Sequence, residues 1–445
     1  MAAAFSMPVM ADDNAPTIEF HGYFRSGVSH STKDGIMNGD IGGIKNFVGR
    51  LGAEASQTYA EIALNSRVFK RNEVEMKVNS RVAYSTAYSK ADWATIGPEQ
   101  ETGSALREFN LEIKGIIPGN PDAILWAGKK FYRRNDIHII DEYYWDVSGA
   151  GGGIENLQVG PGKFSAAWVQ QDIDEMYDMD GYSATSGGGT ENILDLRYEF
   201  NIASNGSLEI GFDYGSIDDD DTVSGDVTTD DGTTKNVKGE SYDNDPFMFT
   251  VQNTWWGSWG WNKTSLQLVW RAWVPALVWA GAQTYSYTSA NNEDAFGIRL
   301  INQGEVRFGD SPFSLAHVLM LNFASDVDNS SDGSSLFDCN VYKLVVRPAF
   351  QLTQYTRILA EVGYSIQDFD FDQTGDGMIK KFKGTLAYAI APDVSILSRP
   401  ELRFYASFIS VKTEDATLGW QSIEHNTGLT STEDFVFGIQ AEAWW

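Results

Sequence analysis

Residues 129–146 hold the densest group of side chains able to do chemistry. Among its charged or titratable residues are Arg133, Arg134, Asp136, His138, Asp141 and Glu142. Two carboxylates about 5–9.5 Å apart beside aromatic rings would suit glycoside hydrolysis. Acidic pairs are common, however, in a chain with 61 Asp and Glu residues, and nothing here marks a carboxyl with a raised pKa. We therefore expect no enzyme, but a site whose guanidinium and carboxylate groups exchange hydrogen bonds with a ligand.

A second group of residues mixes large aromatic rings with charges at every other position. Tyr23 shares its side of the chain with Arg25, and Tyr59 shares its side with Glu61. Trp444 occupies the polar side of the last segment. In a soluble sandwich such a face would meet water. Rings set among charges suit the wall of a pore better, with the apolar side facing lipid.

These side chains must be positioned by strands, because the dominant period of the chain is two. Residues 20–28, 59–64, 401–409 and 435–445 each alternate between apolar and polar positions. Such alternation predicts β-strands with one apolar face. Amphipathic helices are not evident, so we predict an all-β protein whose strands continue to the last residue.

Composition narrows the class of protein further. The 445 residues have a net charge of −28, which argues against a nucleic-acid partner. The 13% aromatic content argues against disorder. The single cysteine, Cys339, cannot form an intramolecular disulfide, and one Cys with five scattered His gives no zinc site. We expect no metal and no cofactor. The run Asp218 to Asp221 lacks the spacing of an EF-hand and is interpreted as solvated loop, with calcium as the alternative.

The rhythm of strands and loops favours a membrane barrel. No run of about 18 apolar residues predicts a transmembrane helix, but barrel strands hide their apolar residues at alternate positions. Polar stretches at 185–190, 216–242 and 325–335 contrast with tight turns such as 203–206. Aromatic clusters at 143–145, 255–256 and 444–445 suit the girdles at the two membrane interfaces. The pattern therefore predicts a transmembrane antiparallel β-barrel and does not fix its strand number.

The first residues bear on the cellular compartment. Residues 1–11 form a short apolar stretch that ends in Ala11, and acidic residues follow from Asp12. We interpret residues 1–11 as the remnant of a signal peptide that is cleaved after Ala11, and residues 12–445 as one outer-membrane barrel domain. A plain disordered N-terminus is the alternative.

Several motifs resemble those of one family, the maltoporins. The matching stretches are 20–27, 50–52, 58–61, 126–146, 211–215, 398–400 and the terminal Trp444-Trp445. The resemblance runs from about residue 19 to the end and is loosest between about 216 and 340. It implies an 18-stranded barrel with short periplasmic turns, long extracellular loops and one loop folded into the lumen. It also implies a homotrimer in outer-membrane lipid that passes maltose and maltodextrins.

The resemblance also assigns roles to single residues. Tyr23, Tyr59 and Trp444 match an aromatic slide along which glucose rings stack, and Trp93 resembles the slide residue that a neighbouring subunit contributes. The polar residues that would contact sugar hydroxyls, at the constriction and along the track beside it, are Arg134, Asp136, His138, Asp141, Tyr143, Arg25, Arg50, Glu61 and Arg107. The alternatives are membrane-girdle or packing roles for the rings, and an ion-pair network that anchors the loop for the charges.

The sequence also departs from the family pattern. Leu397 stands where maltoporins have an aromatic slide residue, so it offers an apolar surface that cannot stack. No ring aligns securely with the slide residue expected around 265–271, where Trp270 and Trp273 are the nearest candidates. The disulfide that some members have in the first loop cannot form here. A pore for sucrose or β-glucosides therefore stays open, as does a general diffusion porin, which would show no saturable sugar block of its ion current.

Overall fold

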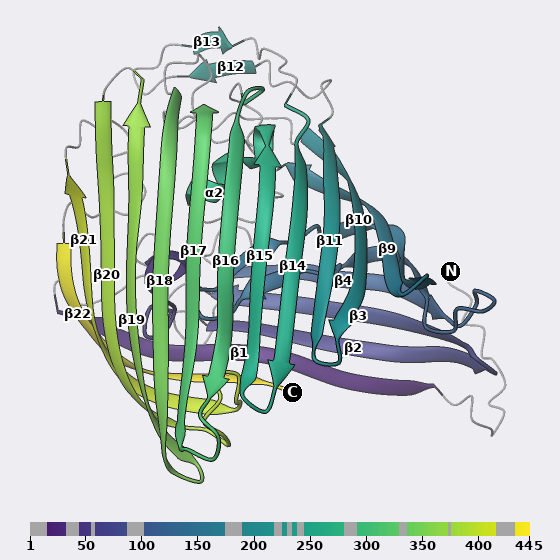
Figure 1. Cartoon of the computed structure of the whole chain (residues 1–445), viewed down its shortest axis with the longest axis horizontal. Coiled ribbons are helices and arrows are strands. Elements are labelled where there is room, and N and C mark those ends of the chain that lie inside the picture. The colour runs from purple at the N-terminus through teal and green to yellow at the C-terminus, as the bar shows by residue number, and fades with distance from the viewer. Residues whose placement is uncertain are drawn as a thin grey trace.

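The wall of the molecule is a single sheet of 18 strands that closes on itself (Figure 1). The computed structural model describes residues 16–32, 44–54, 58–86, 102–173, 189–217, 225–228, 234–237, 244–279, 292–328, 336–372, 375–414 and 432–445. The wall strands are β1 (Thr17–Ser31), β2 (Thr58–Arg71), β3 (Val74–Thr86), β4 (Thr102–Lys114), β5 (Ile124–Lys130), β8 (Gly149–Val159), β9 (Gly162–Ile173), β10 (Gly189–Ala203), β11 (Gly206–Ile217), β14 (Phe247–Gly257), β15 (Gly260–Trp270), β16 (Phe296–Arg307), β17 (Phe313–Asp328), β18 (Leu336–Thr353), β19 (Thr356–Phe371), β20 (Gly375–Ile390), β21 (Glu401–Glu414) and β22 (Thr432–Trp444).

Each wall strand pairs antiparallel with its neighbour in the chain, and β1 pairs with β22 to close the barrel. In the closing pair Tyr23 lies opposite Trp444 and Arg25 lies opposite Glu442. Closure leaves no strand edge unpaired, as a sheet surrounded by lipid requires. The all-β prediction from the alternation and the strand number implied by the resemblance are both confirmed.

The two ends of the barrel differ in the length of their connections. Two residues join β2 to β3, β8 to β9, β10 to β11, β14 to β15 and β18 to β19. The opposite end carries the long segments 32–57, 131–148, 218–246 and 271–295. A small hairpin of β12 (Gly225–Thr228) and β13 (Thr234–Val237) lies at that end (Figure 1). This contrast is the one expected between periplasmic turns and extracellular loops.

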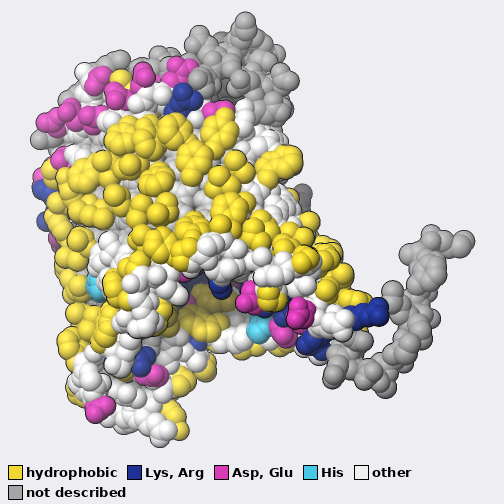
Figure 2. All heavy atoms as spheres, turned by 45° about the vertical axis from the view of Figure 1, so that its right-hand side comes forward, with side chains coloured by type: hydrophobic (Ala, Val, Ile, Leu, Met, Phe, Trp, Pro, Cys, Tyr) yellow, Lys and Arg dark blue, Asp and Glu magenta, His cyan; other side chains and the backbone are white. Residues whose placement is uncertain are grey.

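Side chains of the wall alternate as the sequence predicts. Outward positions are exposed and apolar, as at Phe20 (54%) and Leu386 (61%), whereas inward positions are buried and polar, as at Arg403 (2%) and Gln440 (1%). Figure 2 shows the apolar side chains as a broad band around the outer surface, with acidic side chains gathered beyond it. The same view opens into a hollow in its lower half, edged by charged side chains. The band suits the hydrocarbon of a bilayer, and the hollow belongs to the lumen.

Among the described residues, three segments fold into the lumen. The first is the inner α1 segment (residues 44–54), which contains α1 (Ile44–Val48). The second is the inner hairpin (residues 131–148), which contains β6 (Asn135–Ile137) and β7 (Glu142–Trp145). The third is the inner α2 segment (residues 271–279), with the 3-10 turn η2 (Arg271–Trp273) and α2 (Pro275–Trp279). The resemblance implied one inward loop, and the inner hairpin is that loop; the other two segments were not predicted.

The inner segments pack on apolar positions of the wall. Phe47, Trp145 and Leu277 are buried in one cluster with inward residues of β14–β20, among them Met320 and Val345. Figure 1 shows α2 behind the strands of this wall. In the ranges that the structure describes, no helix is both long and apolar enough to cross a membrane. The packing therefore fills part of the lumen next to β14–β20.

Some predictions fall outside the described residues. These are the signal-peptide remnant with its cleavage before Asp12, the ring of Trp93, and the acidic run Asp218 to Asp221. Cys339 is described, and it is a free, buried thiol.

Candidate functional site in the lumen

Three aromatic rings form a continuous row across three adjacent strands. Tyr23 on β1 lies 5.8 Å from Tyr59 on β2 and 6.4 Å from Trp444 on β22, measured between ring centroids. The planes of Tyr23 and Trp444 differ by only 18°. All three rings are half-buried and occupy the inward parity of their strands. The row therefore presents one apolar strip to the lumen, as the alternation predicts.

Hydrogen bonds fix the two tyrosines of this row. The Tyr23 hydroxyl donates to Glu442 Oε1 at 2.8 Å and accepts from Arg50 Nη2 at 3.3 Å. The Tyr59 hydroxyl donates to Glu61. Each phenol is thus held at its polar end, which leaves the ring in a fixed orientation along the wall.

Trp444 is held by one arginine and by a histidine instead. The Arg399 guanidinium lies 4.4 Å from the centroid of the Trp444 ring, a cation–π contact. The His138 ring meets Trp444 edge-on at 5.7 Å. Arg399 is itself anchored, because it donates to Glu442 Oε2 at 2.5 and 3.1 Å. Trp445, by contrast, is 48% exposed on the outside of the barrel.

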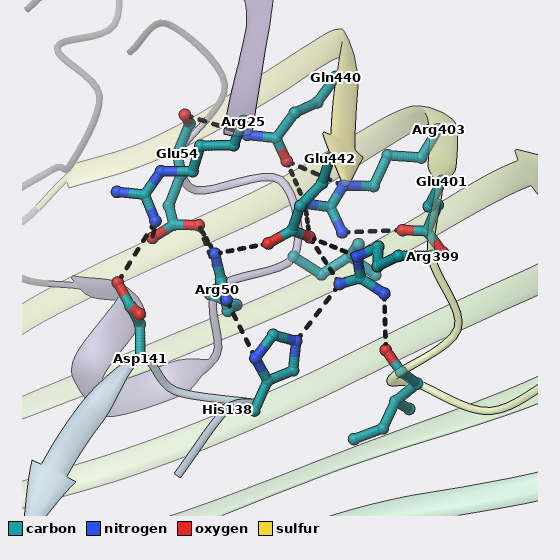
Figure 3. A network of polar contacts seen from close by, with 12 residues as sticks. Arg25, Arg50, Glu54, His138, Asp141, Arg399, Glu401, Arg403, Gln440 and Glu442 are labelled. Atoms are coloured by element: carbon teal, nitrogen blue, oxygen red, sulfur yellow. Dashed lines mark hydrogen bonds and ion pairs between the residues drawn. The ribbon is translucent and has the colours of Figure 1, made fainter. Parts of the chain in front are cut away.

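A buried ion-pair network lies beside the row (Figure 3). Arg25 pairs with Glu54 at 2.8 Å, and Arg50 bridges Glu54 at 2.8 Å to Glu442 at 3.1 Å. These side chains are all less than 10% exposed. The network therefore ties the wall strands β1 and β22 to the inner α1 segment. Arg25 and Arg50 use their donors mainly on carboxylates, so the anchoring interpretation applies to these two residues.

Two glycines place the inner α1 segment where Arg50 can reach the channel. Gly49 and Gly52 have φ angles of +99° and +75°, which side chains with a Cβ rarely adopt. A Cβ on Gly49 would also lie 2.3 Å from Glu361 Oε1. The Arg50 backbone N–H donates to the Ile139 carbonyl at 3.0 Å, which joins the segment to the inner hairpin.

The inner hairpin brings the predicted constriction residues together. Arg134 lies against the rings of Phe131 at 3.6 Å and Tyr143 at 4.8 Å. Arg107 lies 5.2 Å from the same Phe131 ring. The Asp136 side chain is exposed in the lumen. Arg107 is likewise exposed, and Arg134 is half-buried.

Among the titratable groups of the inner hairpin, His138 and Asp141 have pKa values that lie well below their usual range. Burial, together with the neighbouring Arg50 and Arg399 cations, holds the pKa of His138 well below its usual range. Burial alone would raise the pKa of Asp141, but Arg50, Lys45 and Arg25 outweigh it and hold that pKa well below its usual range. His138 is therefore neutral and Asp141 is ionised near neutral pH.

Glu142 and Asp141 of this segment are both held by cations. Glu142 is 2% exposed and accepts from Lys343 at 2.6 Å inside the apolar packing. Asp141 is held by Lys45 at 3.0 Å. Among the described residues, no group of three or more His, Cys, Asp or Glu is arranged to hold a metal ion.

The structure also shows where the positions that depart from the family pattern lie. Leu397 is 40% exposed in the turn between β20 and β21. On β15 the inward positions from 263 to 269 are not aromatic: Lys263, Ser265, Gln267 and Val269; Trp261 shares their parity but lies beside the turn that begins the strand. Trp270 takes the outward parity and stacks on Phe247 at 4.6 Å, whereas Trp273 is buried and donates to Glu191 at 2.9 Å. Neither tryptophan supplies the missing ring.

Several residues of the site were missed by the sequence analysis. Arg81 bridges Glu61 at 2.8 Å and Glu108 at 2.6 Å on the lumen wall. Glu54 and Glu442 hold the network together, and Arg399 and Phe131 contact its rings and cations. Parity alone would have placed Glu442 beside Trp444. Nothing in the sequence signals that Phe131 contacts three arginines.

The chain is similar to known proteins over nearly its whole length. The family model described as LamB porin matches residues 18–445. Maltoporin 2 of Yersinia pestis (strain Pestoides F) is 35% identical over 450 residues, which cover 100% of this chain and 97% of that relative. Maltoporin 1 of Klebsiella pneumoniae subsp. pneumoniae is 35% identical over 452 residues, with the same coverage. The solved structure of OccK2 (OpdF) of Pseudomonas aeruginosa aligns with 96% of this chain and 98% of that chain, at 10% identity and a TM-score of 0.47.

Proposed function

The chain belongs to the LamB porin family and is a sugar porin of the bacterial outer membrane, and on this premise we propose that it carries maltose and maltodextrins by guided diffusion. The single observation that supports this cargo is the row of Trp444, Tyr23 and Tyr59. An α-linked glucose chain has an apolar face of ring C–H groups and an edge of hydroxyls. The row matches the first of these surfaces.

Guided diffusion requires contacts that are repeated and weak. Offset stacking between a sugar ring and an aromatic ring adds about 0.5–1.5 kcal/mol beyond burial of area. A sugar can therefore move from one ring of the row to the next, because neighbouring rings of similar strength replace each other. Centroid spacings of 5.8 and 6.4 Å leave no polar gap between successive rings.

The hydroxyl edge of the sugar would meet charged residues beside the row. Arg107 and Asp136 are exposed members of the predicted polar track, and Arg134 is half-buried. Arg25, Arg50 and Glu61 are buried, and together with Asp141, which pairs with Lys45, they act mainly by holding the rings and the inner hairpin in place. Tyr143 and His138 complete the contact surface beside Arg134 and Trp444.

A pore for another oligosaccharide is the second candidate, and two observations favour it. Leu397 offers no ring, and the inward positions of β15 from Lys263 to Val269 carry no aromatic residue. A shorter aromatic path would favour a disaccharide such as sucrose or a β-glucoside over a long maltodextrin. The two candidates share the row and differ at its ends.

Assembly and processing are part of the proposal. We propose a homotrimer in which Trp93 of one subunit lies at the channel mouth of its neighbour and meets long chains first. We also propose that the mature protein begins at Asp12. N-terminal mass spectrometry of protein from outer membranes would contradict the second statement if residues 1–11 were retained.

Conductance of single channels in planar bilayers tests the proposed cargo. The ion current is titrated with maltose, a series of maltodextrins, sucrose and cellobiose. A saturable block that is strongest for maltodextrins supports the proposal. A stronger block by sucrose or cellobiose would assign another sugar, and the absence of saturable block by every sugar would indicate a general diffusion porin.

A further inference from the structure

The arginines that reach the lumen fall into two groups. Arg25, Arg50, Arg399 and Arg403 bond to buried carboxylates, and Arg81, which also lies 5.5 Å from the Phe131 centroid, bonds to Glu61 and Glu108. Arg107 and Arg134 form no hydrogen bond or ion pair with any residue that the structure describes, and both contact aromatic rings instead. The second group therefore keeps its N–H donors free, and a guanidinium has five of them.

One ring is common to both members of that second group. The guanidinium carbon of Arg134 lies 3.6 Å from the Phe131 centroid, and that of Arg107 lies 5.2 Å from it. The two guanidiniums can be no further apart than the sum of these distances, which a single sugar ring can span. At 3.6 Å the Arg134 group is in van der Waals contact with the ring, so no sugar can stack on that face of Phe131.

Phe131 is itself fixed to the barrel wall. Its backbone N–H donates to Glu108 Oε1 on β4 at 3.2 Å. The other carboxylate oxygen of Glu108 accepts from Arg81 Nε at 2.6 Å, and Arg81 also pairs with Glu61. The next residue but one, Arg133, turns away and pairs with Glu209 on β11 at 2.6 Å. The chain on both sides of Phe131 is therefore anchored, and the ring is a stable platform.

We propose that Phe131 is a positioning residue for sugar binding, which holds the guanidinium planes of Arg107 and Arg134 by cation–π contact. A carboxylate partner would fix an arginine by occupying its donors, whereas a ring fixes the plane and leaves the in-plane N–H groups unoccupied. Guanidinium N–H groups that are already held in place can bind sugar hydroxyls without the entropic cost of ordering a long side chain. This inference rests on the proposed sugar-porin function.

The test is a double-mutant cycle read by sugar block of single-channel current, with whichever sugar of the panel blocks the parent protein best. Phe131→Leu keeps an apolar side chain and removes the π face, and we expect the block constant to weaken about three- to tenfold. Phe131→Tyr should restore binding. In the Arg107→Gln, Arg134→Gln background, Phe131→Leu should add no further loss, because there is nothing left to position.

A matched control separates this role from a structural one. Phe109→Leu changes a ring that is 57% exposed on the outer face, so its sugar block should equal that of the parent. A displaced inner hairpin would change the open-channel conductance. If Phe131 only positions the two guanidiniums, the conductance of Phe131→Leu should stay close to that of the parent protein. The proposal would be overturned if Phe131→Leu weakened the block as much in the Arg107→Gln, Arg134→Gln background as in the parent protein. It would also be overturned if Phe131→Leu alone left the block constant unchanged.

Further measurements keep the proposal testable if one variant fails to assemble or if no sugar blocks. Arg107→Lys with Arg134→Lys keeps both charges but not the planar group, and it should weaken the block as Phe131→Leu does; parental block would overturn the proposal. In a crystal structure of Phe131→Leu or Phe131→Ala, the two guanidiniums should leave their positions. Unchanged guanidiniums would overturn the inference, whereas absence of sugar block in the parent protein would overturn only the proposed function.

Discussion

Replacement of Trp444 by alanine should weaken sugar binding without closing the channel. The ring is the end member of the row, it is nearly parallel to Tyr23, and it is the last inward side chain of β22. Removing it deletes one stacking position, and the loss of about 0.5–1.5 kcal/mol corresponds to a two- to twelvefold weaker block constant. Arg399 loses its cation–π partner but keeps Glu442, so this end of the row should stay ordered.

The assay is sugar-induced block of ion current, and the chain supplies its own matched control. Trp445 is the neighbouring residue on the outer face, in contact with Phe20 at 5.6 Å. Trp445→Ala should therefore leave the block constant unchanged, and Trp444→Phe should retain most of the binding. Open-channel conductance should hardly differ among the three variants, because ions need no stacking surface.

Equal block constants for Trp444→Ala and the parent protein, with every sugar tried, would mean that this ring is an interfacial residue and not a platform. An equal loss in Trp444→Ala and Trp445→Ala would point to disturbed assembly instead of lost stacking.

Further predictions concern the ends of the row, its support and its pH dependence. Leu397→Trp should tighten maltodextrin block severalfold by adding a ring near the exit; no change or weaker block would show that this turn does not touch the sugar. Trp93→Ala should weaken block by long maltodextrins more than block by maltose, and equal weakening would contradict the role proposed at the mouth. Glu54→Gln leaves buried cations without their carboxylate, so the folded barrel should lose about 3–5 kcal/mol of stability, read as a lower temperature of unfolding on gels; an unchanged temperature would contradict it. Since the folded pKa of His138 lies below the usual value, the unfolded chain takes up the proton first, so stability falls as the pH drops below about 6.5; His138→Gln should lose less stability between pH 7.5 and 5 than the parent, and an equal loss would contradict this.

The alternation of the sequence was enough to predict the class of fold and the direction of many side chains. The order of residues 435–445 correctly places Trp444 inside and Trp445 outside, because the period of a strand is two. The number of strands came from the resemblance alone. Closure depends on strand tilt and stagger, which no single segment encodes.

The alternation of apolar and polar residues could not predict the inner α1 and α2 segments. The stretch of α2 has five residues and is too short to show a helical period, and α1 is equally short. Both are held by packing against wall residues that are distant in the sequence, such as Glu361 against the turn at Gly49. The roles of Arg81 and Phe131 likewise depend on where the chain leaves β5, which side-chain parity does not describe.

The most direct test of the account is a crystal structure of the protein with a bound maltodextrin of three or more glucose units. The account predicts that successive sugar rings lie against Trp444, Tyr23 and Tyr59, with hydroxyls within hydrogen-bond distance of Arg107 and Arg134. Sugar bound elsewhere in the lumen, with the three rings uncovered at saturating concentration, would contradict it.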